Sequence, residues 1–365
     1  MASEHHDEQG VYDLSAPGLL GRQGLRMIQL QPTRRCNLSC RHCYSESGPG
    51  KGRDLPFERV GPFLSSAFDL GYSYVGVSGG EPLLWSDLEK TLSFARRLGY
   101  STSVSTNATL LTPEKASLLK DIAGIVAVSV DGPPEEHAVM RNSETAFDAM
   151  LRGLDTLRTA NVPFTLSFTF TQFNADRLSW LYRFAVEEGA AGIHVHPLFS
   201  FGAASGVMDD AVPDSYEFKV ASWLLALLIQ DHGPGGPVVT FDVMQRERIR
   251  QSPWYSSVSG VGSPGRPRFS DLVPSLILET DGCIVPFIYG FPRKWALGFS
   301  GAGDFDQLCS RWSARHGEAL RSMVKRTLEQ LEASGAEYCD FFGELHRTAS
   351  LTADNPNASE NVTAC

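Results

Sequence analysis

Short apolar stretches alternate with amphipathic stretches from about residue 25 to residue 199. The apolar stretches predict six strands, at residues 26–32, 73–79, 101–106, 124–132, 163–170 and 191–199. The stretches between them predict helices, at residues 55–70, 86–98, 113–121, 143–160 and 175–188. Strands that are apolar on both faces are typical of a parallel sheet covered by helices. Six strand–helix units are too few for a closed eight-stranded barrel. We therefore predict an α/β fold, a partial (β/α)6 TIM-like barrel open on one side.

The regular alternation stops after residue 199. The elements expected in this part are a helix, a Ser-, Pro- and Gly-rich loop or lid, a hairpin and two further helices, at residues 213–230, 252–274, 274–287, 305–312 and 315–333. The hairpin turns at Asp281-Gly282. We therefore divide the chain into a lead-in (1–23), the barrel (24–200), an α+β cap and substrate region (201–347) and a disordered tail (348–365).

Charge and hydropathy limit the partners of this protein. The 365 residues carry a formal net charge of −10 and show no dense basic stripe, which argues against a nucleic-acid binder. The longest strongly apolar run, residues 223–229, is far too short to span a membrane. The polar, acidic N-terminus has no apolar core of a signal peptide. We expect a cytoplasmic protein that binds neither nucleic acid nor a membrane.

Three of the seven cysteines lie within eight residues, directly after the first expected strand: Cys36, Cys40 and Cys43. An odd number of cysteines in such a chain argues against a disulfide framework and favours metal or redox chemistry. Three thiolates in one short loop can bind an iron–sulfur cluster or zinc, and His42 is a candidate fourth ligand for zinc. A cubane cluster held by three thiolates keeps one iron open for a cofactor or substrate.

The spacing C-x3-C-x2-C, followed by Tyr44, resembles the radical S-adenosylmethionine (SAM) superfamily. The resemblance implies that Cys36, Cys40 and Cys43 bind one [4Fe-4S] cluster and that SAM chelates its open iron. An electron from a reductant such as flavodoxin or ferredoxin would then cleave SAM to a 5′-deoxyadenosyl radical, which abstracts a hydrogen atom from the substrate.

Four further segments at the ends of expected strands resemble SAM-binding motifs of this superfamily, at residues 78–82, 105–108, 129–133 and 194–198. Together they imply that SAM contacts Tyr44, Gly79, Gly80, Glu81, Asn107, Ser129, Arg141, Val195 and Leu198. The alternatives are a glycine turn for residues 79–80, a solvated surface charge for Arg141 and plain turn or core positions for the others. His194 and His196 share one side of their strand, either as core histidines or as a proton relay.

The C-terminal third resembles the SPASM or Twitch extension of peptide-maturing radical SAM enzymes. Such extensions carry cysteines for auxiliary clusters, but here Val285-Pro286 is followed by Phe287 where a cysteine is usual. We therefore expect a reduced cap without an auxiliary cluster, in which Cys283, Cys309 and Cys339 are buried thiols. One alternative is that Cys283 donates a hydrogen atom to a substrate radical. Asp281, Tyr289 and Tyr338 have no stronger role than turn or core positions.

The resemblance to peptide maturases implies a ribosomally synthesised peptide substrate, modified by crosslinking, epimerisation or excision. Only some 24 residues precede the first strand, so we expect the precursor peptide to be bound either by a separate leader-binding protein or by the cap itself. The alternative substrate is a small molecule, a sugar or nucleoside, changed by epimerisation, dehydration or decarboxylation in natural-product biosynthesis. A third hypothesis is a metal-binding scaffold that has lost its chemistry, which the presence of Glu81, Asn107 and Arg141 argues against.

Overall fold

A ten-stranded sheet forms the centre of the molecule. The computed structural model describes residues 25–260 and 267–351. The strands follow the order β11-β10-β9-β1-β2-β3-β4-β5-β6-β7. Their bounds are β1 (Met27–Leu30), β2 (Tyr74–Val77), β3 (Ser101–Thr106), β4 (Ile125–Ser129), β5 (Phe164–Phe170), β6 (Gly192–Pro197), β7 (Val238–Phe241), β9 (Ser275–Leu278), β10 (Cys283–Pro286) and β11 (Gly298–Phe299).

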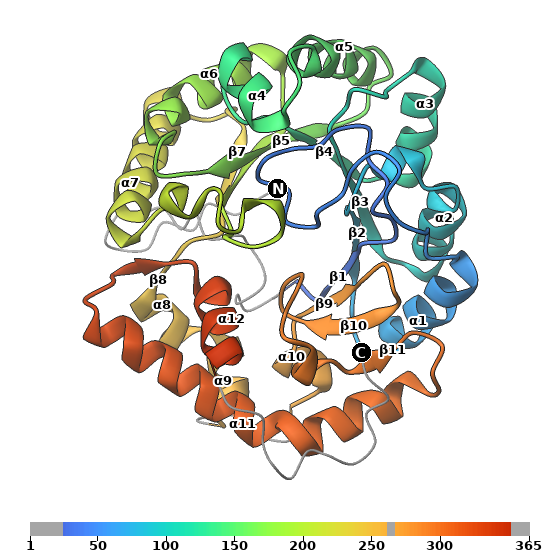
Figure 1. Cartoon of the computed structure of the whole chain (residues 1–365), viewed down its shortest axis with the longest axis vertical. Helices are drawn as coiled ribbons and strands as arrows, with labels where there is room; N and C mark the ends of the chain where they lie inside the picture. Colours follow the sequence, from blue (N-terminus) through green and yellow to red (C-terminus); the bar gives the residue numbers. More distant parts are fainter. Residues whose placement is uncertain (1–24, 261–266, 352–365) are drawn as a thin grey trace.

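Each neighbouring pair in the series β9, β1, β2, β3, β4, β5, β6, β7 is parallel. The strand β10 is antiparallel to both of its neighbours, β9 and β11. The six expected strands are present, and β7 adds a seventh that the sequence analysis missed. Helices cover the outer side of the curved sheet (Figure 1), at α1 (Phe57–Asp69), α2 (Leu88–Leu98), α3 (Pro113–Ile122), α4 (Pro134–Arg141), α5 (Ala146–Thr159), α6 (Leu178–Glu188) and α7 (Ser215–His232). This arrangement confirms the predicted parallel-strand, TIM-like α/β fold.

Local sequence signals determine where these helices begin and end. Thr112 caps α3 by accepting a hydrogen bond from the amide of Lys115, and Pro113 occupies the first turn, where no backbone donor is needed. α2 ends at Gly99 with φ of 105°, a conformation that glycine adopts at little cost. The expected helix at 143–160 is α5, but the short helix α4 before it was not predicted.

The C-terminal region differs from the prediction in three places. Within the expected loop or lid at 252–274, residues 253–259 and 269–272 are helical, because Trp254 and Phe269 are buried in the core, and residues 261–266 lie outside the described residues. The two expected helices are a single helix, α11. The helices of this region are α8 (Arg246–Gln251), α9 (Pro253–Ser259), α10 (Phe269–Leu272), α11 (Phe305–Ala333) and α12 (Phe341–Leu351), and β8 (Met244–Gln245) forms a small sheet with β12 (Tyr338–Cys339).

The disordered tail is predicted to begin at residue 348, which is too early, because α12 continues to Leu351. Thr348 and Ala349 are buried within α12, which runs to Leu351, so residues 348–351 belong to the folded chain. The rest of the tail and the expected lead-in at 1–23 lie outside the described residues. The hairpin is confirmed: β9 and β10 pair antiparallel around Asp281-Gly282.

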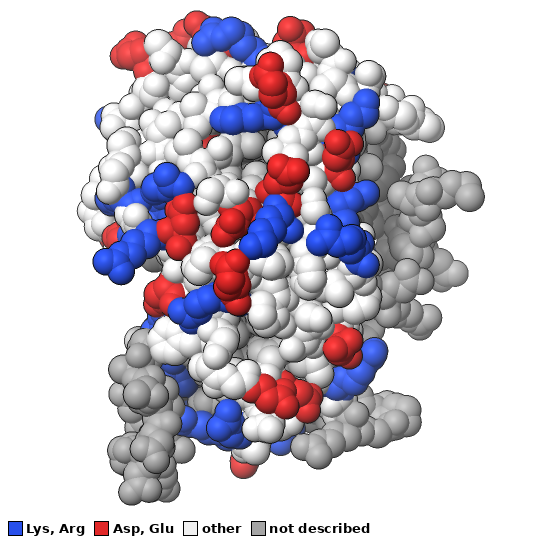
Figure 2. Space-filling model, turned by 90° about the vertical axis from the view of Figure 1, so that its right-hand side faces the viewer, with Lys and Arg blue, Asp and Glu red and all other residues white. Residues whose placement is uncertain are grey.

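The surface charges are mixed on the face that Figure 2 shows, where Lys and Arg side chains alternate with Asp and Glu. This face carries no continuous basic patch of the kind that binds nucleic acid. Within residues 25–260 and 267–351, no helix is both long enough and apolar enough to cross a membrane.

Candidate functional site

The three clustered cysteines lie on a loop, residues 31–54, that we call the cysteine loop. It follows β1 and crosses the middle of the ring of strands (Figure 1). Backbone hydrogen bonds fix it to the next strand end, because the amides of Gly80 and Glu81 donate to the carbonyls of Thr33 and Arg35 at 2.8 Å each. The loop after β6 also contacts it, through the amide of Ala203 and the carbonyl of Cys43. The cysteines are thus held at the carboxyl ends of the strands, where α/β barrels form their sites.

All three thiols are half-buried and each has an N–H or O–H neighbour. The amide of Leu38 and the side-chain amide of Asn107 face Cys36 Sγ at 3.5 and 3.8 Å. The amide of Ser47 donates to Cys43 Sγ at 3.3 Å. Burial, with smaller contributions from Glu81 and the two other thiols, raises the pKa of Cys36 to about 11. A bound metal centre would offset this cost, because it supplies the positive charge that thiolates need.

These features fit an iron–sulfur cluster. Each thiolate of such a cluster binds a different iron, and N–H donors to the sulfurs are a regular part of its surroundings. The described part of the chain contains no group of three His, Cys, Asp or Glu side chains close enough to hold a single metal ion. The zinc alternative required His42 as a ligand, but Nε2 of His42 faces Asp131 Oδ2 at 3.7 Å.

Gly79 and Gly80 make room for the cysteine loop itself. A Cβ on Gly80 would lie 2.2 Å from the carbonyl oxygen of Arg35, and one on Gly79 would lie 2.8 Å from that of Thr33. Gly79 also has a φ of 105°, which favours glycine. The motif predicts that the backbone at these glycines lies close to SAM. In the structure, this backbone lies close to the backbone of the cysteine loop. Their contact with SAM remains a prediction.

We expect Gly80→Ala to destabilise the fold by about 1–3 kcal/mol, because the methyl group overlaps backbone atoms that cannot rotate away. The measurement is urea unfolding followed by circular dichroism. Gly317→Ala in α11 is the control: nothing lies within 4 Å of its Cβ, so alanine should stabilise this helix by about 0.5–1 kcal/mol. An unchanged stability of Gly80→Ala would contradict the close approach.

Glu81 and Asn107 join the ends of β2 and β3 to the cysteine loop. The carboxylate of Glu81 is fully buried and accepts hydrogen bonds from the amides of Leu83 and Asn107 and from the hydroxyl of Thr106. Burial raises the pKa of Glu81, and these donors oppose the shift. The side-chain amide of Asn107 donates to Asn37 Oδ1 at 3.0 Å. Both residues therefore stand beside the cysteine loop and are already bonded within the protein, and their contact with SAM remains a prediction.

Asp131 is the centre of a buried ion-pair network that the sequence analysis did not single out. Its Oδ2 lies 2.6 Å from Nε of Arg141, and both side chains are at most 10% exposed. The guanidinium of Arg141 also lies 3.8 Å from Cys40 Sγ. Burial alone would raise the pKa of Asp131, but Arg141, His42 and His137 together lower it far below its ordinary value. A sequence signal was present, because Asp131 lies within the segment 129–133, which resembles a SAM-binding motif.

The remaining expected SAM contacts occupy different environments. Ser129 ends β4 and is partly exposed, and the Tyr44 hydroxyl lies 3.1 Å from Ser78 Oγ. Val195 is fully buried in the main core, on the side of β6 opposite to the two histidines, so its side chain points away from the inner side of the sheet. Leu198 packs under the loop after β6 with Ala204 and other apolar residues. A SAM contact at Val195 would therefore have to use its backbone.

The hairpin brings the cap against the cysteine loop. The rings of Tyr289 and Tyr44 meet edge to face with centroids 5.2 Å apart. Phe287, which stands where a cysteine was expected, packs on Trp254, Phe291 and Phe342. An aromatic cluster thus fills the volume next to the hairpin.

Cys283, Cys309 and Cys339 are each buried and lie on β10, α11 and β12. Cys283 lies at the same end of the sheet as the cysteine loop, because β9 pairs in parallel with β1, and its thiol interacts with Arg293. Its side chain has no exposed surface. A hydrogen-atom donor must reach its substrate, so this role for Cys283 stays a prediction that requires movement of the hairpin. Cys365 lies outside the described residues.

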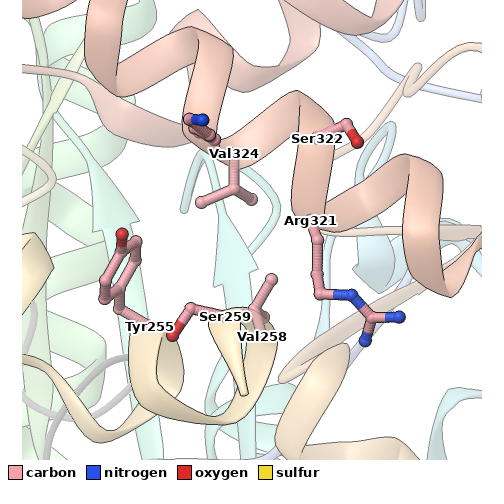
Figure 3. A pocket seen from close by; sticks show the side chains of 7 residues that line it. Tyr255, Val258, Ser259, Arg321, Ser322 and Val324 are labelled. Carbon is pink, nitrogen blue, oxygen red and sulfur yellow. The ribbon is translucent and has the colours of Figure 1, made fainter. Parts of the chain in front are cut away.

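A hollow between α9 and α11 lies away from these residues, at the lower edge of Figure 1. Figure 3 shows its lining, which comprises Tyr255, Val258, Ser259, Arg321, Ser322, Val324 and Lys325. This lining contains no thiol, imidazole or carboxylate, so the cysteine loop remains the candidate site.

Comparison with known proteins agrees with this assignment. Residues 30–185 match the family model of the radical SAM superfamily. An AdoMet-dependent heme synthase of Nitratidesulfovibrio vulgaris is 28% identical over 208 residues, which cover 56% of this chain and 56% of that protein. Mycofactocin maturase MftC of Mycolicibacterium smegmatis is 29% identical over 238 residues, which cover 64% of this chain and 55% of that protein.

The fold also has solved counterparts. Streptococcus suis SuiB bound to precursor peptide SuiA superposes with a TM-score of 0.57 at 14% identity, covering 72% of this chain and 60% of that chain. This likeness shows the fold alone. The chain spans about half the length of the curated relatives it matches. The cysteine loop, the strand-end motifs beside it and the family match together identify a radical SAM domain in this chain, over residues 30–185.

Proposed function

We propose that this protein modifies a ribosomally synthesised peptide by radical SAM chemistry. When bound, the [4Fe-4S] cluster and SAM supply an electron and a 5′-deoxyadenosyl radical that abstracts a hydrogen atom from the substrate. The observation that carries the proposal is the cysteine loop, whose three half-buried thiols have N–H and O–H neighbours at the strand ends.

The residues of this chain have separable tasks in that reaction. Cys36, Cys40 and Cys43 would hold the cluster, and Arg141 places a fixed positive charge 3.8 Å from Cys40 Sγ, where it stabilises thiolate. Glu81, Asn107, Gly79 and Gly80 hold the cysteine loop against β2 and β3. Tyr44, Ser129 and the end of β6 are the remaining residues proposed to contact SAM. The packed Tyr44–Tyr289 pair restricts access of water from the hairpin side.

The peptide substrate is supported by the maturases among the similar proteins, including SuiB with its bound precursor peptide. A small molecule is the second candidate, because the similar proteins also include heme synthases and a GTP 3′,8-cyclase. We further propose a separate leader-binding protein and a flavodoxin or ferredoxin reductant as partners, and a cytoplasmic location.

The test uses the full chain reconstituted without oxygen. With dithionite and SAM it should release 5′-deoxyadenosine. The substrate class is tested in source cells that carry either the wild-type gene or a Cys36/Cys40/Cys43→Ala gene. A mass feature that appears only in wild-type cells identifies the product. If the proposal is correct, this feature lies in the peptide fraction. If the substrate is instead a small molecule, it lies in the small-molecule fraction. Failure of the reconstituted wild type to release 5′-deoxyadenosine would overturn the radical SAM assignment of function.

A further inference from the structure

An imidazole–carboxylate pair joins the middle of β6 to the end of β7. Nε2 of His194 lies 2.9 Å from Oδ2 of Asp242, which directly follows β7. The backbone of Asp242 is fixed as well, because its amide donates to the carbonyl of Val195 at 3.0 Å. Half of the pair is therefore supplied by the end of the unexpected strand β7. His194 begins the segment 194–198 that resembles a SAM-binding motif, but neither His194 nor Asp242 is among the residues expected to contact SAM.

The pair faces the inner side of the curved sheet. Ile193 and Val195 are buried in the core under the helices, and side chains alternate along a strand, so His194 and His196 point to the opposite, inner side. The two imidazole rings lie 5.7 Å apart. His196 is influenced electrostatically by Asp131 and His42, which stand beside Cys40. Polar groups thus extend across the interior from the cysteine loop to Asp242.

These side chains are not packed as a structural core pair would be. The side chains of His194 and Asp242 are 39% and 35% exposed, although burial is the largest influence on the pKa of each. Both side chains are therefore surrounded by protein, yet part of the surface of each remains accessible to solvent or a small ligand. Burial would lower the pKa of His194, but Asp242 outweighs it and raises that pKa, while burial and the neighbouring His194 lower the pKa of His196 to about 4.

We propose that His194 is a catalytic acid that protonates an oxygen of the substrate, and that Asp242 positions its ring. The proposal rests on the proposed function, since it adds a proton-transfer step to that reaction. An N–H bond of the imidazolium breaks and an O–H bond forms on a carbonyl, carboxylate or leaving hydroxyl oxygen. One positive charge moves from the ring to the substrate, and no electron is transferred. Both a peptide and the small-molecule alternative carry such oxygens.

The charged and titratable groups around the pair give the expected pH dependence. Asp242 and His196 face His194, Asp131 and His42 act on His196, and Asp242 also acts on Asp340. Product formation should fall as the pH rises through the pKa of His194, because only the protonated ring donates. In Asp242→Asn the same fall should occur at lower pH.

The first experiment separates substrate chemistry from SAM cleavage. His194→Gln should lower formation of the wild-type-only product about 10²–10⁴-fold, the usual contribution of a general acid. Release of 5′-deoxyadenosine by the reconstituted variant without added substrate should stay close to wild type. His232→Gln, at the exposed end of α7, is the matched control and should leave both unchanged. Wild-type product levels in His194→Gln would overturn the proposal. Failure of the proposed function is distinguishable, because the wild type itself would then release no 5′-deoxyadenosine.

The second experiment needs no product and covers the case in which His194→Gln does not fold. Diethyl pyrocarbonate modifies only unprotonated imidazole, and peptide mass spectrometry of the holoenzyme reports each histidine separately. His194 should be modified, with a midpoint above that of a free imidazole, and Asp242→Asn should raise its reactivity at pH 6.5 several-fold while His232 is unaffected. An unreactive His194, or a midpoint that Asp242→Asn does not move, would show a purely structural pair and overturn the proposal.

Discussion

Replacing Cys36, Cys40 and Cys43 together by alanine should abolish both iron binding and SAM cleavage. All three thiols lie on one loop at the carboxyl ends of the strands, and their loss removes the thiols that face Asn107 and Arg141. The wild-type chain, reconstituted without oxygen, should bind about four irons, as one cubane cluster contains. The measurements are iron content and 5′-deoxyadenosine released with dithionite and SAM.

The matched control is Cys309→Ala, which removes a buried thiol of α11. It should retain the full iron content and the release of 5′-deoxyadenosine. About four irons remaining in the triple variant would instead reveal a second cluster in the cap, contrary to our expectation of none. Zinc in place of iron in the wild type purified without oxygen, together with no SAM cleavage after reconstitution, would contradict the assigned chemistry itself.

Arg141→Met should destabilise the protein by about 3–5 kcal/mol, the usual cost of leaving one partner of a buried ion pair without its counter-charge. Asp131 has no exposed side-chain surface, and Arg141 provides the closest compensating charge, 2.6 Å away. Arg158→Met is the control. Its partner Glu188 is partly exposed and Arg158 is 41% exposed, so the change should cost less than about 1 kcal/mol. Urea unfolding followed by circular dichroism gives both values.

The same variant should acquire a characteristic pH dependence. In the wild type the pKa of Asp131 is held far below its ordinary value, so the pair contributes its stability throughout the neutral range and loses it only at strongly acidic pH. Burial is already the largest single influence on that pKa, and Arg141 is the largest opposing one, so the pKa of Asp131 should rise when Arg141 is removed. The folded variant then binds a proton more tightly than the unfolded chain, so its destabilisation should shrink as the pH falls. A destabilisation that is small and independent of pH would show that the pair does not form.

The cap and the barrel were predictable to different degrees. The six strands and the β9–β10 hairpin followed from apolar runs and from the Asp281-Gly282 turn, signals that depend on neighbouring residues only. β7 was missed because four residues, one of them exposed, carry too weak a pattern, and pairing with β6 defines the strand. The helices at 252–274 were missed because burial of Trp254 and Phe269 outweighs a composition typical of loops.

Sequence by itself determined that a cysteine loop follows the first strand and that the other motifs follow the next strands. Because parallel strands share one carboxyl edge, this order already places Cys36, Glu81, Asn107 and Ser129 on one side of the fold. Tertiary structure decided which groups meet there. Asp131 pairs with Arg141, and His194 with Asp242, across 10 and 48 positions of sequence. No local pattern records such pairs, since their energy arises from burial and from charges that only folding brings together.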